Sequence, residues 1–548
     1  MGHIASWIAG ATWKPGLDNL GTQQPCEFIY SALLPGITNV TERAWLFGFY
    51  PWFIWAFEKR HPDASDTEFR ESLRRADCLA TLVAARHEIV CGDKHDGDPR
   101  NHGSALPGRL KLIPAARSLS EGSTLRLSDF ADRSEENPLR YFKNRLGGLG
   151  QYYLGVLRDE YGVLFGDGRS GVRYVKDVAL PLITAFNDGL DDKLFLDAVD
   201  GDHVTSDLLD QLSPFCPCAL HERRETARTY LADMFLGRIS PSTPTQIKRR
   251  LSLGLALDFL AGANGAESDD ETIGFLCACY SGTLPTQRSW ELPPPFGEVR
   301  AQWALYLRNE MLSLAWQAVF KATLEKLDGV RGIADIRSAA VWCVEQPEFE
   351  AAIAKFGHAS FDEAVKAELR SLPQLTEEQH PQHELALWRK LLASEAAELL
   401  AAAMRMLAVL IARHGETADH YAPLRLSKTV LVDYPLTLNT LGESARGPWR
   451  GPSTEHWLRM LIATALSTHQ RVAIRKWGQS HDDTLMFRIG ENGLFVERLP
   501  ERLAQTQPRL GQAFQILRDL GLTLVKTSGH LPALSASGQA ALDDIRHG

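Results

Sequence analysis

Helical periodicity in the central part of the chain is the feature that most limits its possible folds. In the stretches 301–320 (AQWALYLRNEMLSLAWQAVF) and 385–416 (LALWRKLLASEAAELLAAAMRMLAVLIARHGE), apolar residues recur every three or four positions. This spacing predicts amphipathic helices. The second stretch ends on Arg413, His414 and Gly415, a pattern typical of a helix C-terminus. The sequence therefore predicts a mainly α fold with a multi-helical body.

The most apolar run, AWLFGFYPWFIWAF from Ala44 to Phe57, has Pro51 near its middle. It is too short to span a bilayer, which takes about 20 residues of helix. We therefore expect a buried helix, kinked at Pro51, in which Trp45, Trp52 and Trp55 belong to the core. No membrane association is expected, because no longer apolar run occurs.

Composition places the chain among ordinary globular proteins. Hydrophobic residues make up 44% and charged residues 23% of the sequence. The eight cysteines are too few and too scattered for a disulfide framework, which favours a reducing cytoplasm. The formal net charge of −9 argues against a surface covered by nucleic acid, but it leaves room for local basic patches.

Shifts in composition along the chain predict several units. We expect an aromatic-rich helical domain with a loop region at its end, a first hairpin-containing unit, a helical bundle, an irregular linker and a C-terminal unit. The corresponding ranges are 1–138 (with the loop region 91–138), 139–195, 196–420, 421–453 and 454–548.

Two segments share the order helix, hairpin, helix. The C-terminal one, ILRDLGLTLVKTSGHLPALSASGQAAL, runs from Ile516 to Leu542, and the earlier one covers residues 151–186. Both carry Leu-Arg-Asp at the end of the first helix. The C-terminal segment resembles winged-helix regulators of the MarR and ArsR type, in which Leu-Thr-x-x-Gly precedes the last helix. Leu534, Ser535 and Gly538 take those places here. The resemblance covers about 50 residues and implies one or two small winged-helix (α+β) units.

This resemblance implies contact with nucleic acid. Residues 508–520 would form the recognition helix, since Arg and Gln side chains can read base edges. Basic residues in the earlier copy and before the C-terminal hairpin would contact phosphates. The candidate nucleic-acid-binding residues are Lys143, Arg145, Arg169, Arg173, Lys176, Arg471, Arg475, Lys476, Arg509, Gln512, Gln515 and Lys526. The alternative is that these units are packing or protein-docking modules.

Two groups of residues carry the side chains that bind metals. RHEIVCGDKHDGDPRNHG, residues 86–103, offers imidazoles and carboxylates, and it is the candidate centre of a metal-dependent nuclease or hydrolase. Its spacing fits no established motif, and a solvated loop is the alternative. The candidate catalytic residues are His87, His95, Asp96, Asp98 and His102.

A pair of Cys-x-Cys units forms the second group. Four thiolates would bind zinc if the two segments met, and the alternative is that the cysteines are structural and buried. No cofactor is expected otherwise. The candidate metal ligands are Cys216, Cys218, Cys277 and Cys279.

The sequence lacks the motifs of several enzyme classes. It contains no P-loop, no Rossmann turn, no Gly-x-Ser-x-Gly elbow and no His-Glu-x-x-His helix. We therefore expect a non-enzymatic scaffold or adaptor that binds nucleic acid, a protein partner or both. The nuclease or hydrolase and a ligand-sensing DNA-binding regulator remain as alternatives. The absence of ATPase and hydrolase motifs fits a subunit of a larger machine. Residues 33–57 resemble uncharacterised bacterial proteins encoded near phage-defence genes, which implies a role in phage defence.

Overall fold

The computed structural model describes most of the 548 residues. The described ranges are 18–91, 102–167, 171–239, 243–268, 270–393, 396–415, 419–424, 436–480, 483–524 and 529–547. Five of the candidate site residues lie outside these ranges: His95, Asp96, Asp98, Arg169 and Lys526.

The fold is mainly helical, as the periodicity predicts. In the described part of the chain, the strands form three separate antiparallel pairs. Leu164 lies opposite Tyr174, and Phe487 lies opposite Val496. The pairs are β1 (Leu125–Arg126) with β4 (His203–Val204), β2 (Leu164–Asp167) with β3 (Gly171–Tyr174), and β5 (Phe487–Gly490) with β6 (Gly493–Val496).

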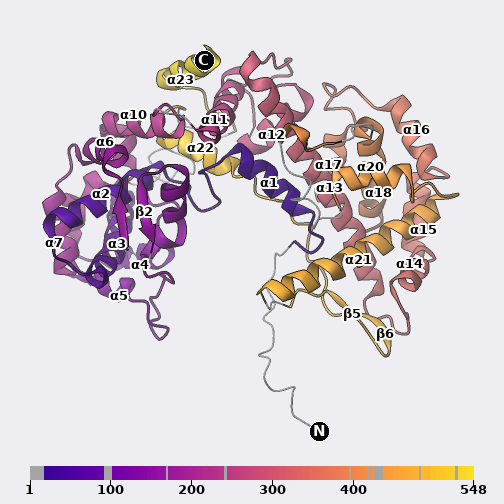
Figure 1. The fold of residues 1–548 in the computed structure, drawn as a ribbon, viewed down its shortest axis with the longest axis horizontal. Helices are drawn as coiled ribbons and strands as arrows, with labels where there is room; N and C mark the ends of the chain where they lie inside the picture. The colour runs from indigo at the N-terminus through magenta and orange to yellow at the C-terminus, as the bar shows by residue number, and fades with distance from the viewer. Residues whose placement is uncertain are drawn as a thin grey trace, which may run out of the picture.

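Two lobes form an arch (Figure 1). The first lobe is built around α2 and α3, and short helices pack on them. Its elements are α2 (Ala44–Arg60), α3 (Asp66–Cys91), α4 (Arg109–Ser118), α5 (Leu127–Ala131), the π-helical turns η1 (Leu149–Tyr153) and η2 (Val156–Glu160), α6 (Lys176–Asn187), α7 (Asp192–Gly201), α8 (Ser206–Gln211), η3 (Ser213–Phe215), α9 (Cys218–Arg223) and α10 (Glu225–Phe235).

The second lobe surrounds α13, the longest helix, which packs against α18 and α21. The β5–β6 hairpin also lies in this lobe (Figure 1). Its helices are α13 (Gly297–Leu327), α14 (Ile336–Val344), α15 (Pro347–Phe356), α16 (Phe361–Ser371), α17 (Glu384–Ala393), α18 (Ala396–His414), η5 (Ala422–Leu424), α20 (Leu438–Arg446) and α21 (Thr454–Ser480).

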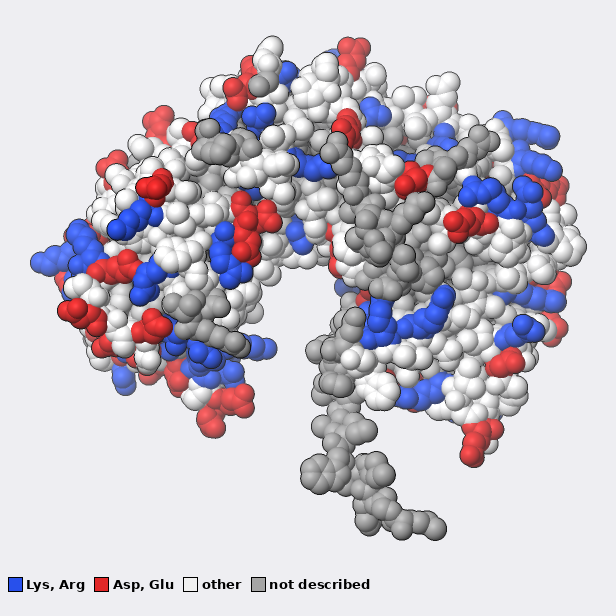
Figure 2. Space-filling view, in the orientation of Figure 1, with Lys and Arg blue, Asp and Glu red and all other residues white. Residues whose placement is uncertain are grey.

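Helices from both ends of the chain join the two lobes across the top of the arch (Figure 1). Among them, α22 packs on α2 and α9 of the first lobe and also on α11 and α12. The surface is hollowed between the lobes (Figure 2). The connecting elements are α1 (Gln23–Leu33), α11 (Pro244–Gly262), α12 (Glu271–Ser281), η4 (Pro294–Phe296), α22 (Leu510–Asp519) and α23 (Ala536–His547).

Helix α2 is the aromatic segment that the sequence places in the core. Trp45 and Trp52 are fully buried, and the Trp52 indole donates to Asn187 Oδ1 at 2.7 Å. Trp55 is partly buried against the core. The helix runs through Pro51 without a break in its assignment. None of the helices in the described ranges is both long and apolar enough to cross a bilayer.

The order helix, paired segments, helix occurs at both predicted positions. Helix α22 is followed by an antiparallel bridge between Thr523 and Leu534 and then by α23. In the earlier copy, η2 is followed by β2, β3 and α6. The resemblance to winged-helix regulators stays a prediction.

Candidate metal centre

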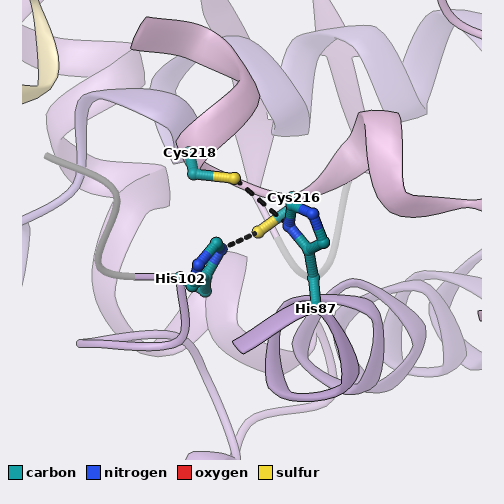
Figure 3. Close-up of side chains that lie close together, drawn as sticks. All are labelled: His87, His102, Cys216 and Cys218. Atoms are coloured by element: carbon teal, nitrogen blue, oxygen red, sulfur yellow. Dashed lines mark hydrogen bonds between the residues drawn. The ribbon is translucent and has the colours of Figure 1, made fainter. Parts of the chain in front are cut away.

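Four side chains from distant parts of the sequence converge inside the first lobe. Each of His87, His102, Cys216 and Cys218 offers one ligand atom, and these atoms all lie within 4.8 Å of one another (Figure 3). His102 and the two cysteines are at most 2% exposed, while His87 is half-buried. Two imidazoles and two thiols are a ligand set that zinc prefers.

The local backbone brings the two cysteines to one place. Cys216 is extended, with φ −65° and ψ 139°, whereas Pro217 is already helical. The backbone N–H of Ala219 then donates to the Cys216 carbonyl at 3.0 Å, which starts α9 at Cys218. In a regular helix, residues two apart point to different faces. The extended backbone at Cys216 therefore lets both sulfur atoms face the histidines.

The histidines come from α3 and from a loop formed by the described residues just before α4. His87 lies one turn before the end of α3 at Cys91, and His102 stands directly before Gly103. A Cβ atom at Gly103 would lie 2.6 Å from Arg109 Nη1, so glycine allows the loop to approach α4 closely. Arg109 also faces Glu88, with 3.5 Å between Nη1 and Oε2. These contacts hold the loop against the end of α3.

The interatomic distances fit a tetrahedral zinc site. His102 Nδ1 lies 3.0 Å from Cys216 Sγ, and His87 Nδ1 lies 3.3 Å from Cys218 Sγ. With zinc bonds of about 2.0–2.3 Å, the ligand atoms of a regular tetrahedron are about 3.3–3.8 Å apart. The two imidazole rings are nearly perpendicular, with centroids 4.6 Å apart. Small side-chain adjustments therefore suffice to surround a zinc ion.

The surroundings shift the pKa values of the two cysteines in opposite directions. A hydrogen bond from the Cys216 thiol, together with hydrogen bonds from the two imidazoles, lowers the pKa of Cys218 to about 3. Burial and the neighbouring Cys218 sulfur raise the pKa of Cys216 well above its usual value. The thiolate is the form that binds metals, and these shifts favour it at Cys218.

Neither ring nitrogen of His102 has a strong hydrogen-bond partner among the described residues. Its Nδ1 contacts a sulfur atom, which is a weak hydrogen-bond partner. Its Nε2 is buried and has no partner among the described residues. Burying a polar ring with such weak partners is costly. A metal ion bound at Nδ1 would offset that cost.

The sequence analysis named all four residues of this cluster but assigned them to two different sites. It placed His87 and His102 in a hydrolytic centre, and it paired the two Cys-x-Cys units with each other. Cys277 and Cys279 instead lie in α12, outside the convergent group. Both are buried, and burial raises the pKa of each thiol. The surroundings of Cys277 and Cys279 are those expected for structural, buried cysteines, which was the alternative to a zinc site.

The candidate base-reading residues of α22 make contacts within the chain. Arg509 Nη1 donates to the Ile37 carbonyl at 2.9 Å. Gln512 lies 3.4 Å from the Asn39 carbonyl, and Gln515 donates to Asp519 Oδ1 at 2.9 Å.

The candidate phosphate-binding residues differ in exposure. Lys143, Arg145 and Lys176 are exposed, and Arg173 pairs with Glu58 at 3.1 Å.

On α21, Arg471 is exposed, whereas Arg475 and Lys476 are half-buried. The Lys476 ammonium donates to the Asp18 carbonyl. Arg471 is therefore the most accessible of these three cations.

Comparisons with family models, with curated proteins and with solved structures find no match for this chain. Its function is therefore inferred from the site itself.

Proposed function

We propose that this chain is a helical scaffold protein that binds zinc for structural stability. The observation that carries the proposal is the convergence of two imidazoles and two thiols from three separate segments within 4.8 Å. His87, His102, Cys216 and Cys218 would hold the ion. Zinc bound there would fasten the end of α3, the following loop and the start of α9 to one another.

The ligand set supports a structural rather than a catalytic role. Catalytic zinc sites have three protein ligands and keep a position open for water or substrate. Four protein side chains complete the tetrahedron here, and three of them are almost fully buried. A nuclease or hydrolase centred on His87 and His102 would need one of the cysteines to leave the metal.

The test is the metal content of the purified protein and of matched cysteine variants. We expect about one zinc ion per chain in the natural sequence and a large loss of zinc in Cys216→Ser. Cys277→Ser is the control, because it removes a buried thiol from a Cys-x-Cys unit outside the centre. Full zinc content in Cys216→Ser, or no zinc uptake by the natural sequence on titration, would refute the proposal.

A second candidate function is contact with nucleic acid at the end of α21. Ile474 is 62% exposed and Trp477 is 51% exposed, three and six residues after the exposed Arg471 on the same helix. This end of α21 lies on the side of the gap between the lobes (Figure 1). An exposed aromatic ring beside cations is the combination on which bases of single strands stack. It supports the adaptor hypothesis with nucleic acid as a partner.

Binding of a labelled single-stranded oligonucleotide across a salt series tests this second function. Affinity should fall as salt rises, and the double change Arg471→Glu and Trp477→Ala should weaken binding at low salt. Lys366→Glu is the control, since Lys366 is an exposed cation on α16, on the far side of the second lobe (Figure 1). If the protein does not bind the oligonucleotide at low salt, this second function is refuted. The proposal of a zinc-binding scaffold then remains.

A further inference from the structure

The last residue of α22 is anchored to the first helix of the first lobe. Asp519 Oδ2 accepts hydrogen bonds from Arg43 Nε at 2.9 Å and from the Ala44 backbone N–H at 3.0 Å. The side chains of Arg43 and Asp519 are 1% and 2% exposed. Gln515 donates to the other oxygen, Oδ1. The carboxylate therefore also caps the N-terminus of α2, where a negative charge is favourable.

The same arginine connects this anchor to the metal centre. Arg43 Nη1 donates to the carbonyl of Ser104 at 3.2 Å, and Ser104 is two residues after His102. A single buried guanidinium thus contacts the loop that carries one of the proposed ligands and also holds α22.

A second path leads from the centre to α22 through α9. Helix α9 begins at the ligand Cys218, and it packs on α22. Arg228 in α10 donates to the His221 carbonyl of α9 at 2.5 Å. Its side chain also lies against Gly521, where a Cβ atom would be 3.2 Å from Arg228 Cδ. The turn after α22 therefore rests on the helices that follow the Cys-x-Cys unit.

Helix α22 is also tied to the connecting helices. Arg518 pairs with Glu271 at the start of α12 at 2.8 Å, and this pair is nearly buried. Helix α12 in turn packs on α13 of the second lobe. Helix α22 is thus one of the physical links between the metal-bearing lobe and the rest of the arch.

We propose that zinc binding at the centre controls how firmly α22 docks on the first lobe, and that the Arg43–Asp519 pair couples the two. The inference rests on the proposed function, because it requires that the centre binds zinc. With zinc bound, the loop at His102 and the start of α9 are fixed, so both supports of α22 are in place. Without zinc, these supports loosen and α22 detaches more often.

Because of thermodynamic linkage, the coupling can also be measured as a change in zinc affinity. If zinc favours the docked helix, then the docked helix favours zinc by the same factor. Weakening the anchor should therefore lower zinc affinity, although Asp519 is not a ligand. A purely local stabilisation of α22 would leave zinc affinity unchanged.

The experiment compares zinc affinity, measured by competition with a chromogenic chelator, in full-length variants. Asp519→Asn should lower the affinity at least about five-fold, the usual lower range of coupling between sites. Gln515→Ala removes the second hydrogen bond to Asp519 and a hydrogen bond that Gln515 accepts from Arg518, and it should have a smaller effect in the same direction. It carries the test if Asp519→Asn does not fold.

The matched control is Asp258→Asn. Asp258 is also a buried carboxylate of a connecting helix, and it anchors α23 through Arg546 at 2.8 Å. It accepts a second hydrogen bond from the Trp290 indole at 2.8 Å. Since none of these contacts involves the metal centre, zinc affinity should stay within about two-fold of the natural value, well below the coupling range.

Hydrogen exchange of the natural sequence with zinc and with chelator gives an independent readout. Chelation should speed exchange in residues 510–522 and 43–47, and α14 to α16 should not change. Stoichiometric zinc with unchanged affinity in both anchor variants and unchanged exchange in α22 would overturn the coupling and leave the proposed function intact. Failure to bind zinc at all would overturn both.

Discussion

At the residue scale, the two ligand cysteines differ although only Pro217 separates them. The pKa of Cys218 is lowered to about 3 because the Cys216 thiol and the imidazoles donate to its sulfur atom. The pKa of Cys216 is raised by burial and by the adjacent thiolate. A metal ion must displace the remaining proton, since both sulfur atoms bind as thiolates.

We therefore predict that zinc binding near pH 7.5 releases about one proton from the cysteine pair rather than two. Calorimetric titrations in two buffers with different ionisation enthalpies measure this number. Cys277→Ser should release the same number of protons, because Cys277 lies outside the convergent group. Release of two protons by the natural sequence would show that both cysteines are thiols before zinc binds.

A second residue-scale prediction concerns Asp77, a buried carboxyl group on α3. It accepts hydrogen bonds from the Tyr50 hydroxyl at 2.9 Å and from the Gly148 N–H at 2.8 Å. Burial raises the pKa of Asp77 to about 7. The folded state then keeps a proton that the unfolded state loses near pH 4. The free energy of unfolding should fall as pH rises from about 4 to about 7, by up to about 4 kcal/mol.

Asp77→Asn removes this titration; its amide oxygen can accept from the Gly148 N–H, and its amide nitrogen can donate to the Tyr50 hydroxyl. Relative to the natural sequence, its free energy of unfolding should rise between pH 4 and pH 8, as measured by urea denaturation. Burial also raises the pKa of Glu310 to about 7, but Glu310 is present in both proteins and cancels in the difference. Asp63→Asn, at an exposed position, serves as the control. A difference that stays constant with pH would contradict the prediction.

At this scale, the sequence identifies residue types but not their partners. His87, His102, Cys216 and Cys218 all stand out by their chemistry. Their grouping depends on contacts between positions more than 110 apart, such as His102 with Cys216 and Cys218 with His87. Local spacing carries no information on such contacts. The two Cys-x-Cys units have the same spacing, but the first begins with the extended residue Cys216 and the second lies within α12.

At the element scale, α23 depends on a close approach of two backbones. The Ser535 hydroxyl accepts from the Gly538 N–H at 3.0 Å and donates to the Gly521 carbonyl at 2.6 Å. A Cβ atom at Gly538 would lie 1.8 Å from the Leu522 carbonyl oxygen. Gly538 is one of the residues that carry the resemblance to winged-helix regulators. Its position here has a direct steric reason, whether or not the unit binds nucleic acid.

We predict that Gly538→Ala destabilises the protein by about 2 kcal/mol or more, because the backbone of α23 must move away from Leu522. The matched control is Gly511→Ala in α22, where nothing lies within 4 Å of an added Cβ and the residue is exposed. That change should be neutral or stabilising by up to about 1 kcal/mol, as expected from helix propensity. Thermal unfolding of both variants distinguishes a steric effect from a general cost of alanine.

The positions of the helices along the sequence were easier to predict than the groups that they contact. The apolar spacing of residues 301–320 and the aromatic segment 44–57 correspond to α13 and to buried α2. The surroundings of α22 were less predictable, because its polar face has the residue types of a DNA-reading surface. In the structure, Arg509 and Gln515 bond to groups of the same chain. Periodicity indicates that a helix is amphipathic, but it does not indicate what covers its polar face.

At the scale of the whole molecule, helices that follow one another near the C-terminus pack on different parts of the arch. Residues 454–548 were predicted as one unit. Helix α21 packs on α13 and α14 of the second lobe, whereas α23 packs on α11 and α22 reaches the first lobe. The C-terminal segments therefore connect distant parts of the arch. A composition shift along the sequence cannot reveal that division, because it arises from long-range packing.

The metal centre and the continuity of the core together predict how the molecule unfolds. The buried apolar residues form one cluster that extends through both lobes. With zinc bound, the first lobe is stabilised by mass action, by about 4 kcal/mol when free zinc is a thousand times its dissociation constant. The lobes should then unfold together in urea, because neither is much weaker than the other.

Removal of zinc should separate the two unfolding events. The first lobe loses the fastening of α3, the His102 loop and α9, whereas no described residue of the second lobe belongs to the centre. We therefore predict that chelation shifts the first lobe to a lower urea midpoint and leaves the second lobe nearly unchanged. Pulse proteolysis with mass identification of the fragments assigns each transition to a lobe. Cys277→Ser should behave like the natural sequence with and without chelator. A single transition at an unchanged midpoint after zinc removal would show that the metal, even if bound, does not support the first lobe.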